Sequence, residues 1–262
     1  MQLPLYQIDA FTNQLFGGNP ACVVPLDAWL PVELMLNITK ENAVAETAFF
    51  VMGEEKIHLR WFTPEIEMDL CGHATLATAH CLKSILNYPN PEIIFETKSG
   101  DLRVTENDGW YSMDFPSRMP EPALLPENIQ KALSIQPKAV FKSRDYVLEY
   151  ESEEAIRSIE VDRNHFDLHN LDPGGVIVTA PGIEADFVSR FFTPQASILE
   201  DPVTGSAHCS LIPFWAERLE KNELLAHQIS YRHGVLRCKN AGDRVFISGQ
   251  ARTYSKGEFL FG

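Results

Sequence analysis

The sequence predicts an α+β fold made of two similar halves that face each other. Three observations predict this class: a motif repeated half a chain apart, an apolar helical stretch after each copy, and many short strand-like segments. The two copies are residues 60–64 (RWFTP) and 190–194 (RFFTP), in a chain of 262 residues. A period of half the chain indicates two copies of one structural unit.

Each copy is followed by a glycine turn and then by a stretch that is apolar on nearly all sides, residues 74–82 and 207–216. A helix that is apolar all round is buried, so each half is expected to enclose one helix. Short segments bounded by turn residues predict the surrounding strands: 5–10, 22–25, 47–52, 57–62, 92–97, 102–105, 111–115, 139–141, 146–149, 174–179, 187–192, 229–232, 236–239, 245–248 and 258–261. Short helices are expected at 31–42, 126–133, 153–159 and 163–168.

A proline-rich stretch, residues 116–122, separates the halves. Proline restricts its own backbone and that of the preceding residue, so this stretch predicts an extended connector. We therefore expect an N-terminal half at 1–116, completed by the last strand at 251–262, and a C-terminal half at 117–250.

Composition excludes several classes of protein. The formal net charge is −14, which opposes general binding to nucleic acid or to anionic membranes. No apolar run is long enough to span a bilayer, and the N-terminus does not have the pattern of a signal peptide. The five cysteines are odd in number, widely spaced and without a Cys-x-x-Cys pair. This pattern predicts reduced thiols in the cytoplasm, with no disulfide framework and no metal site.

The two glycine turns are candidate binding sites for an anion. A helix start exposes unpaired N–H groups and a partial positive charge, and glycine allows close approach to the backbone. Gly72 with His73, and Gly205 with Ser206, are therefore candidate donors to a substrate carboxylate. The alternative is that both glycines only begin a helix.

Glu46 is the candidate general acid or base. It is the only charged residue between positions 43 and 52. Burial favours the uncharged form of a carboxylic acid and brings it closer to the range in which proton transfer works best. The alternative is an ordinary glutamate that points to water.

Three further residues lie near the turns. Asp201 could cap the following helix, bind a substrate amine or hydroxyl, or share a proton with Glu46. Cys71 stands at a helix start, where the pKa of a thiol is expected to fall, so it could be a nucleophile or base; the alternative is a small buried apolar residue. His208 is a weaker candidate for a substrate contact, since a lone histidine there is more often structural.

Six motifs occur in a specific order: 9–12 (DAFT), 18–24 (GNPACVV), 46–49 (ETAF), 60–64 (RWFTP), 71–75 (CGHAT) and 200–207 (EDPVTGSA). Through them the whole chain resembles the phenazine-biosynthesis F-like family, within the diaminopimelate epimerase and proline racemase superfamily. The resemblance implies two pseudo-symmetric halves, each a β-barrel-like roll around a central helix, with the active site in the cleft between them. It also implies no cofactor and a homodimer.

The resemblance implies that Glu46 shuttles a proton and that His73, Asp201, Gly205 and Ser206 line the substrate pocket. The racemases and epimerases instead use two cysteines, one at each turn. Here the second turn carries Thr204, whose hydroxyl is too weak a base. We therefore expect an isomerase that moves a proton on one face of a small carboxylate-bearing substrate.

Two alternatives stay open at this point. One is an amino-acid epimerase or racemase that uses Cys71. The other is a non-catalytic protein that binds small acids.

Overall fold

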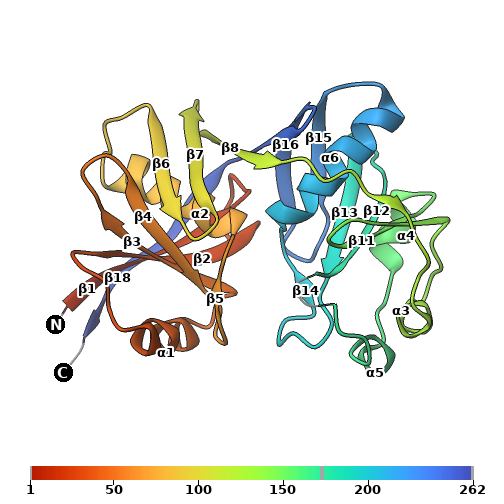
Figure 1. Cartoon of the computed structure of the whole chain (residues 1–262), viewed down its shortest axis with the longest axis horizontal. Helices are drawn as coiled ribbons and strands as arrows, with labels where there is room; N and C mark the ends of the chain where they lie inside the picture. The colour runs from red at the N-terminus through yellow and green to blue at the C-terminus, as the bar shows by residue number, and fades with distance from the viewer. Residues whose placement is uncertain (1, 172–173, 261–262) are drawn as a thin grey trace. The chain divides into compact units, whose positions relative to one another are not determined.

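The computed structural model describes residues 2–171 and 174–260 (Figure 1). The chain divides into two compact units: one runs to Asp114 and resumes at Ser248, and the other spans Phe115–Ile247. The halves expected at 1–116 with 251–262 and at 117–250 stay a prediction about independent domains, and Phe261 of the predicted strand 258–261 lies outside the described residues.

The first unit has nine strands and two helices in its described part. The strands are β1 (Gln2–Ala10), β2 (Asn19–Leu26), β3 (Glu46–Met52), β4 (Ile57–Phe62), β5 (Glu67–Met68), β6 (Glu92–Thr97), β7 (Gly100–Asn107), β8 (Trp110–Pro116) and β18 (Ala251–Leu260). The helices are α1 (Val32–Asn42) and α2 (Gly72–His80), and α2 continues into one π-helical turn, η1 (Cys81–Ile85).

The second unit repeats this arrangement with more helices. Its strands are β9 (Glu121–Pro122), β10 (Ala139–Lys142), β11 (Tyr146–Glu149), β12 (Val176–Pro181), β13 (Phe187–Phe192), β14 (Glu200–Asp201), β15 (Glu223–Gln228), β16 (Gly234–Ala241) and β17 (Arg244–Gly249). Its helices are α3 (Glu127–Ala132), α4 (Glu153–Ser158), α5 (Arg163–Phe166) and α6 (Gly205–Leu219).

Strand pairing follows the same order in both units. In the first, β2 pairs with β3 in parallel, β3 with β4 antiparallel, β4 with β6 in parallel, and β6 with β7 antiparallel. In the second, β11, β12, β13, β15 and β16 pair in the same sequence of parallel and antiparallel contacts. The half-chain repeat predicted from the sequence is therefore a repeat of topology.

Each unit contains one buried helix at the equivalent point of this order. Every residue of α2 up to Ala79 is buried, and the helix packs against β1, β2, β3 and β18. In the second unit α6 is buried from Ala207 to Ala216 and packs against β15 and β16. Figure 1 shows each helix among the strands of its own unit. The prediction of two buried helices is confirmed.

The repeated motif also forms the same ion pair twice. Arg60 on β4 donates to both carboxylate oxygens of Glu67 on β5, at 2.7 and 2.8 Å. Arg190 on β13 donates in the same way to Glu200 on β14, at 2.7 and 2.9 Å. Each guanidinium also lies over a phenylalanine ring two residues further along its strand. The motif therefore joins two neighbouring strands in each unit through a bidentate, charge-assisted contact.

One predicted strand is wrong. Residues 229–232 form a turn, and the strand that pairs with β13 is β15 at Glu223–Gln228. The reason lies in the turn chemistry, because the Ser230 hydroxyl accepts from Arg232 N–H and donates to the Pro202 carbonyl. These local contacts compete with strand pairing.

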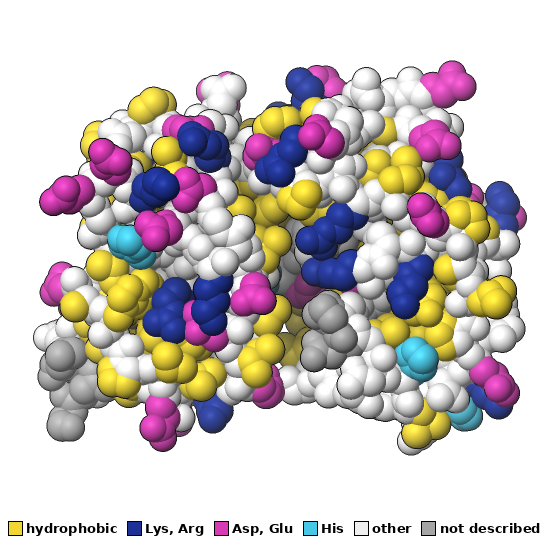
Figure 2. Space-filling model, in the orientation of Figure 1, with side chains coloured by type: hydrophobic (Ala, Val, Ile, Leu, Met, Phe, Trp, Pro, Cys, Tyr) yellow, Lys and Arg dark blue, Asp and Glu magenta, His cyan; other side chains and the backbone are white. Residues whose placement is uncertain are grey.

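The described part of the chain contains no helix long and apolar enough to cross a membrane. Acidic side chains are spread over the visible face of the molecule rather than gathered into one patch (Figure 2). Charge of this kind is a property of the surface and does not mark a site.

Candidate functional site

Four predicted site residues of the first unit come together at the start of α2. Cys71 is the N-cap residue, with extended backbone (φ −143°, ψ 108°), and its side chain makes no capping hydrogen bond. Gly72 and His73 are the first two residues of the helix. The first N–H groups of a helix have no partner within it, and here the N-cap side chain does not satisfy them. The start of α2 is therefore suited to an anion.

Glu46 reaches this helix start from β3. It is the first residue of the strand, paired with Ala21 of β2, and its side chain is 16% exposed. Its Oε2 lies 3.1 Å from Nε2 of His73. This is an ion-pair distance, but the alignment is not that of a hydrogen bond, and both atoms are buried without a hydrogen-bond partner among the described residues. Buried polar atoms without partners are costly, so a ligand that satisfies them binds favourably.

The other edge of the His73 ring is held by two neighbours. Nδ1 lies 3.3 Å from Nδ2 of Asn19 and 3.6 Å from Sγ of Cys71. Burial alone would lower the pKa of His73, but Cys71 and Glu46 raise it well above its ordinary value. The groups around the ring therefore favour the protonated form of His73.

Cys71 differs from expectation in its protonation. The sequence predicts a lowered pKa for a thiol at a helix start. Burial instead raises the pKa of Cys71, and the attraction of His73 is too small to reverse this. That prediction is wrong, because the helix end is buried and desolvation of a thiolate outweighs the charges that favour it. The thiol is protonated at neutral pH and is a weak nucleophile.

Glu46, Cys71 and His73 also have the side-chain chemistry of metal ligands. One ligand atom of each lies within 4.8 Å of the others. However, the closest contacts of the imidazole use opposite ring nitrogens: Nε2 faces Glu46 and Nδ1 faces Cys71. A metal site needs its donors to converge on one point. The contacts therefore suit a chain of proton-carrying groups better than a metal cage.

The second unit brings Asp201, Gly205 and Ser206 to the equivalent place, the start of α6. Thr204 is the N-cap (φ −111°, ψ 98°), again without a capping hydrogen bond from its side chain. Its hydroxyl donates to Oδ2 of Asp201 at 2.5 Å. Asp201 is therefore not the N-cap of α6; it contacts the N-cap residue from β14.

Gln228 anchors this turn, and sequence reasoning missed it. Its Oε1 accepts from Thr204 N–H and its Nε2 donates to the Asp201 carbonyl, both at 2.8 Å. The side chain is fully buried at the end of β15. The available signal was a glutamine on the buried side of an alternating strand, in phase with Leu224 and Ala226.

Arg144 is a second residue of this turn that sequence reasoning missed. Its Nη2 donates to Oγ of Ser206 at 2.9 Å, and the same guanidinium pairs with Asp145. Only the tertiary fold brings this arginine to Ser206, 62 residues further along the chain.

His208 lies one turn inside α6. Its Nδ1 donates to the Thr204 carbonyl at 2.8 Å, and burial lowers the pKa of the ring to about 4. The imidazole is therefore neutral at physiological pH. Its contacts are those of a structural histidine, and a contact of His208 with substrate stays a prediction.

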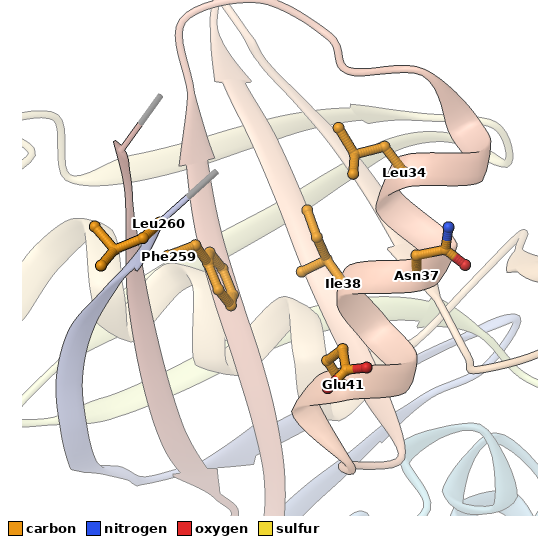
Figure 3. Close-up of a pocket in the computed structure, with 6 residues that line it drawn as sticks. All are labelled: Leu34, Asn37, Ile38, Glu41, Phe259 and Leu260. Carbon is orange, nitrogen blue, oxygen red and sulfur yellow. The ribbon is translucent and has the colours of Figure 1, made fainter. Parts of the chain in front are cut away.

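A separate groove lies between α1 and the end of β18 (Figure 3). It has a volume of about 250 Å³ and is lined mainly by apolar side chains: Leu34, Asn37, Ile38, Glu41, Phe259 and Leu260. No predicted site residue lines it, so the groove is distinct from the start of α2.

The sequence profile of the phenazine biosynthesis-like proteins matches residues 8–257. The match covers nearly the whole chain. This chain belongs to the phenazine biosynthesis-like protein family. Among its relatives, an uncharacterized isomerase of Pseudomonas aeruginosa is 46% identical over 257 residues, 98% of each chain.

Solved structures support the same family and its fold. A PhzF-family phenazine biosynthesis protein of Enterococcus faecalis matches over 100% of both chains, with 43% identity and a TM-score of 0.95. A hydroxyproline epimerase of Agrobacterium vitis covers 98% of this chain and 92% of its own, with a TM-score of 0.62 at 9% identity, which shows the fold alone. The predicted α+β, diaminopimelate epimerase-like fold is confirmed.

Proposed function

We propose that this protein is an isomerase that moves a proton on a small carboxylate-bearing substrate, with Glu46 as the acid and base. The observation that carries the proposal is the buried contact of Glu46 with His73 at a helix start whose N–H groups are not capped by a side chain. The P. aeruginosa relative is named an isomerase, which supports the class of reaction.

The chemistry needs only groups of this chain. The N–H groups at Gly72 and His73 bind the substrate carboxylate and stabilise negative charge that develops on it. Glu46 takes a proton from a substrate carbon, and the C–H electron pair moves into the adjacent unsaturated system. Glu46 then returns the proton to another carbon of that system. Substrate and product are isomers, so atoms and electrons balance without an oxidant or reductant.

His73 stabilises the negative charge at both stages of this proton transfer. As a cation beside Glu46, it stabilises the carboxylate before proton transfer. Once Glu46 is protonated, the imidazolium faces the electron-rich intermediate and stabilises it. The same-face shift requires one base, and Glu46 supplies it.

Two features favour Glu46 over a pair of thiols. The Cys71 thiol is buried with a raised pKa, and the equivalent N-cap of the second unit is Thr204. A racemase of the two-cysteine kind needs a base on each face of the reacting carbon. The roles predicted for Asp201, Gly205 and Ser206, together with a cytoplasmic location and a homodimer, stay predictions.

One observation favours a second candidate function. The 3.6 Å contact of Cys71 with His73 places a positively charged imidazole beside a thiol, and such a charge favours the thiolate, which is the nucleophilic form. In that case the protein would be an epimerase that uses Cys71 together with Glu46.

The test is a screen of small cyclic and unsaturated carboxylic acids in heavy water, followed by NMR. We expect wild-type protein to introduce deuterium into at least one acid and Glu46→Gln to lose about 10²- to 10⁴-fold in rate. Glu54→Gln, an exposed glutamate of the same unit, is the matched control and should keep the wild-type rate.

Three outcomes would redirect the proposal. Full activity in Glu46→Gln would remove Glu46 as the base. Exchange at a stereocentre that is lost in Cys71→Ala would favour the epimerase. Binding of an acid without any exchange would indicate a binding protein.

A further inference from the structure

The second unit carries a charged pair where the first unit has none. The equivalent strand registers align Arg144 and Asp145 with Pro20 and Ala21 of the first unit. The two units therefore share a backbone plan at this point but not its charge.

A buried carboxylate holds the Arg144 guanidinium in place. Asp145 is 1% exposed and accepts from Nε and Nη2 of Arg144 at distances of 2.8 to 3.2 Å. Its Oδ1 also accepts from the Gly175 N–H at 2.8 Å. The arginine is thus ordered before any ligand arrives, which lowers the entropic cost of binding.

The ordered guanidinium leaves donors available. Nη2 donates to Oγ of Ser206 at 2.9 Å, so the serine oxygen accepts and its own proton is directed to another acceptor. The contacts that hold Arg144 use Nε and Nη2 and do not use Nη1, and the side chain is 30% exposed. The Ser206 hydroxyl and Nη1 of Arg144 can therefore both donate to an oxygen atom of a ligand.

The backbone of a second arginine, Arg118, contacts α6 one helical turn after Ser206. Arg118 N–H donates to the Cys209 carbonyl at 2.9 Å, and Cys209 is three residues after Ser206, on the same helix face. Burial raises the pKa of Cys209 to about 11, and the positive charges of Arg118 and Arg144 both act against this rise. Nη1 of Arg118 is buried without a hydrogen-bond partner in the described part of the chain. A buried guanidinium donor without an acceptor is costly unless an anion satisfies it.

We propose that Arg144 and Arg118, with the Ser206 hydroxyl, form a carboxylate subsite in the second unit. The proposal deepens the proposed function and rests on it for the class of ligand, an organic acid. The subsite binds the acid through charge-assisted hydrogen bonds from Nη1 of each arginine and through the Ser206 hydroxyl.

The test is binding of benzoate to the intact protein, measured by NMR titration, with benzamide as its uncharged counterpart and inorganic phosphate as a second anion. We expect wild type to bind benzoate at least tenfold more tightly than benzamide. Arg144→Met and Arg118→Met should each weaken benzoate binding about tenfold or more, as expected for loss of a charged hydrogen bond. Arg157→Met, which removes an exposed arginine of α4 in the same unit, is the matched control and should bind like wild type.

Charge-retaining variants keep the test decisive if a methionine variant does not fold. Arg144→Lys and Arg118→Lys should keep part of the affinity, because they retain the charge but lose the planar guanidinium that positions the donors. Unchanged benzoate affinity in the folded arginine variants would overturn the proposal. So would absence of benzoate binding to wild type, or binding of phosphate without benzoate.

The experiments distinguish failure of the carboxylate subsite from failure of the proposed isomerase activity. Glu46→Gln should bind benzoate at least as tightly as wild type. If no acid exchanges deuterium while benzoate binding depends on the arginines, the subsite stands and the isomerase does not.

Discussion

The starts of α2 and α6 have the same topology, the same extended N-cap and different chemistry. The first has Cys71 as N-cap, a histidine as second helical residue and a glutamate on the adjoining strand. The second has Thr204, Ser206 and, where the strand registers place the equivalent of Glu46, Gly175. One start holds a carboxyl group, an imidazole and a thiol, and the other holds hydrogen-bond donors around a fixed arginine. The comparison teaches that a repeated backbone can be kept while its two copies take separate chemical roles.

Removing the arginine of the repeated ion pair should give the largest difference in stability between the two units. Arg190 also donates from Nη1 to the Ile156 and Ile159 carbonyls, at 3.0 and 2.9 Å, so its removal leaves these acceptors and Glu200 without this donor. In the first unit, Glu67 would still pair with Lys98, whose Nζ lies 2.9 Å from it, after removal of Arg60. We expect Arg190→Met to lower the free energy of unfolding by about 3 kcal/mol or more, and Arg60→Met by about 1 kcal/mol. Urea unfolding of both variants measures this. Equal losses would show that the additional contacts contribute little.

The two buried histidines should respond to pH in opposite directions. His208 has a pKa of about 4 in the folded state, below its value in the unfolded chain, about 6.5. The unfolded state therefore binds more protons between these values, and stability falls as the pH drops through this range, by up to about 3 kcal/mol. His73 has a raised pKa, so its contribution is complete below about pH 6.5 and is lost as pH rises through its folded-state pKa.

NMR titration of the two ring Cε1–H signals measures these values directly, and urea unfolding across pH measures their effect. His208→Gln should remove the loss in acid. A His208 signal that titrates near its unperturbed value would contradict the assignment of a neutral, structural ring.

A side chain at the position equivalent to Glu46 should not fit in the second unit. A Cβ on Gly175 would lie 2.4 Å from Cζ of Phe191 and 2.8 Å from the Phe192 carbonyl oxygen. We expect Gly175→Ala to cost about 1 to 3 kcal/mol, because a backbone atom cannot move aside cheaply. Gly257→Ala, where nothing lies within 4 Å of the added carbon, is the control and should be neutral. Thermal unfolding compares the two, and an unchanged Gly175→Ala would show that the strand adjusts.

Replacing the N-cap residue of α2 by that of α6 should have the smallest effect on the deuterium exchange rate. Cys71→Thr gives α2 the N-cap residue of α6. If Glu46 is the base, the deuterium exchange rate should stay within about tenfold of wild type, since the buried thiol is protonated and not needed. A loss beyond about 10³-fold, with the fold intact, would favour the thiol mechanism.

Sequence patterns predicted the features that depend on local order. The repeated 60–64 and 190–194 segments and the two apolar stretches led to the duplicated topology and its buried helices. The family resemblance implied that Glu46 and His73 share one site, and the two side chains lie 3.1 Å apart within the first unit. The participation of these residues in catalysis stays a prediction.

Residues that act through distant contacts were not found from the sequence. Asn19 lies 54 positions before His73, and Arg144 lies 62 before Ser206. Gln228 holds a turn 24 positions earlier in the chain. Such pairs leave no local periodicity, because their partners are brought together only when strands of different segments align.

Composition and order along the chain were sufficient for the fold class, the repeat and the identity of the two helix starts, since hydrophobic period and turn chemistry act over short distances. The tertiary structure decided the protonation of the groups at those starts. Burial raises the pKa of Cys71 and lowers the pKa of His208, while the neighbouring groups Cys71 and Glu46 raise the pKa of His73. Desolvation and neighbouring charge act through space, so the same residue types acquired different chemistry only once the chain had folded.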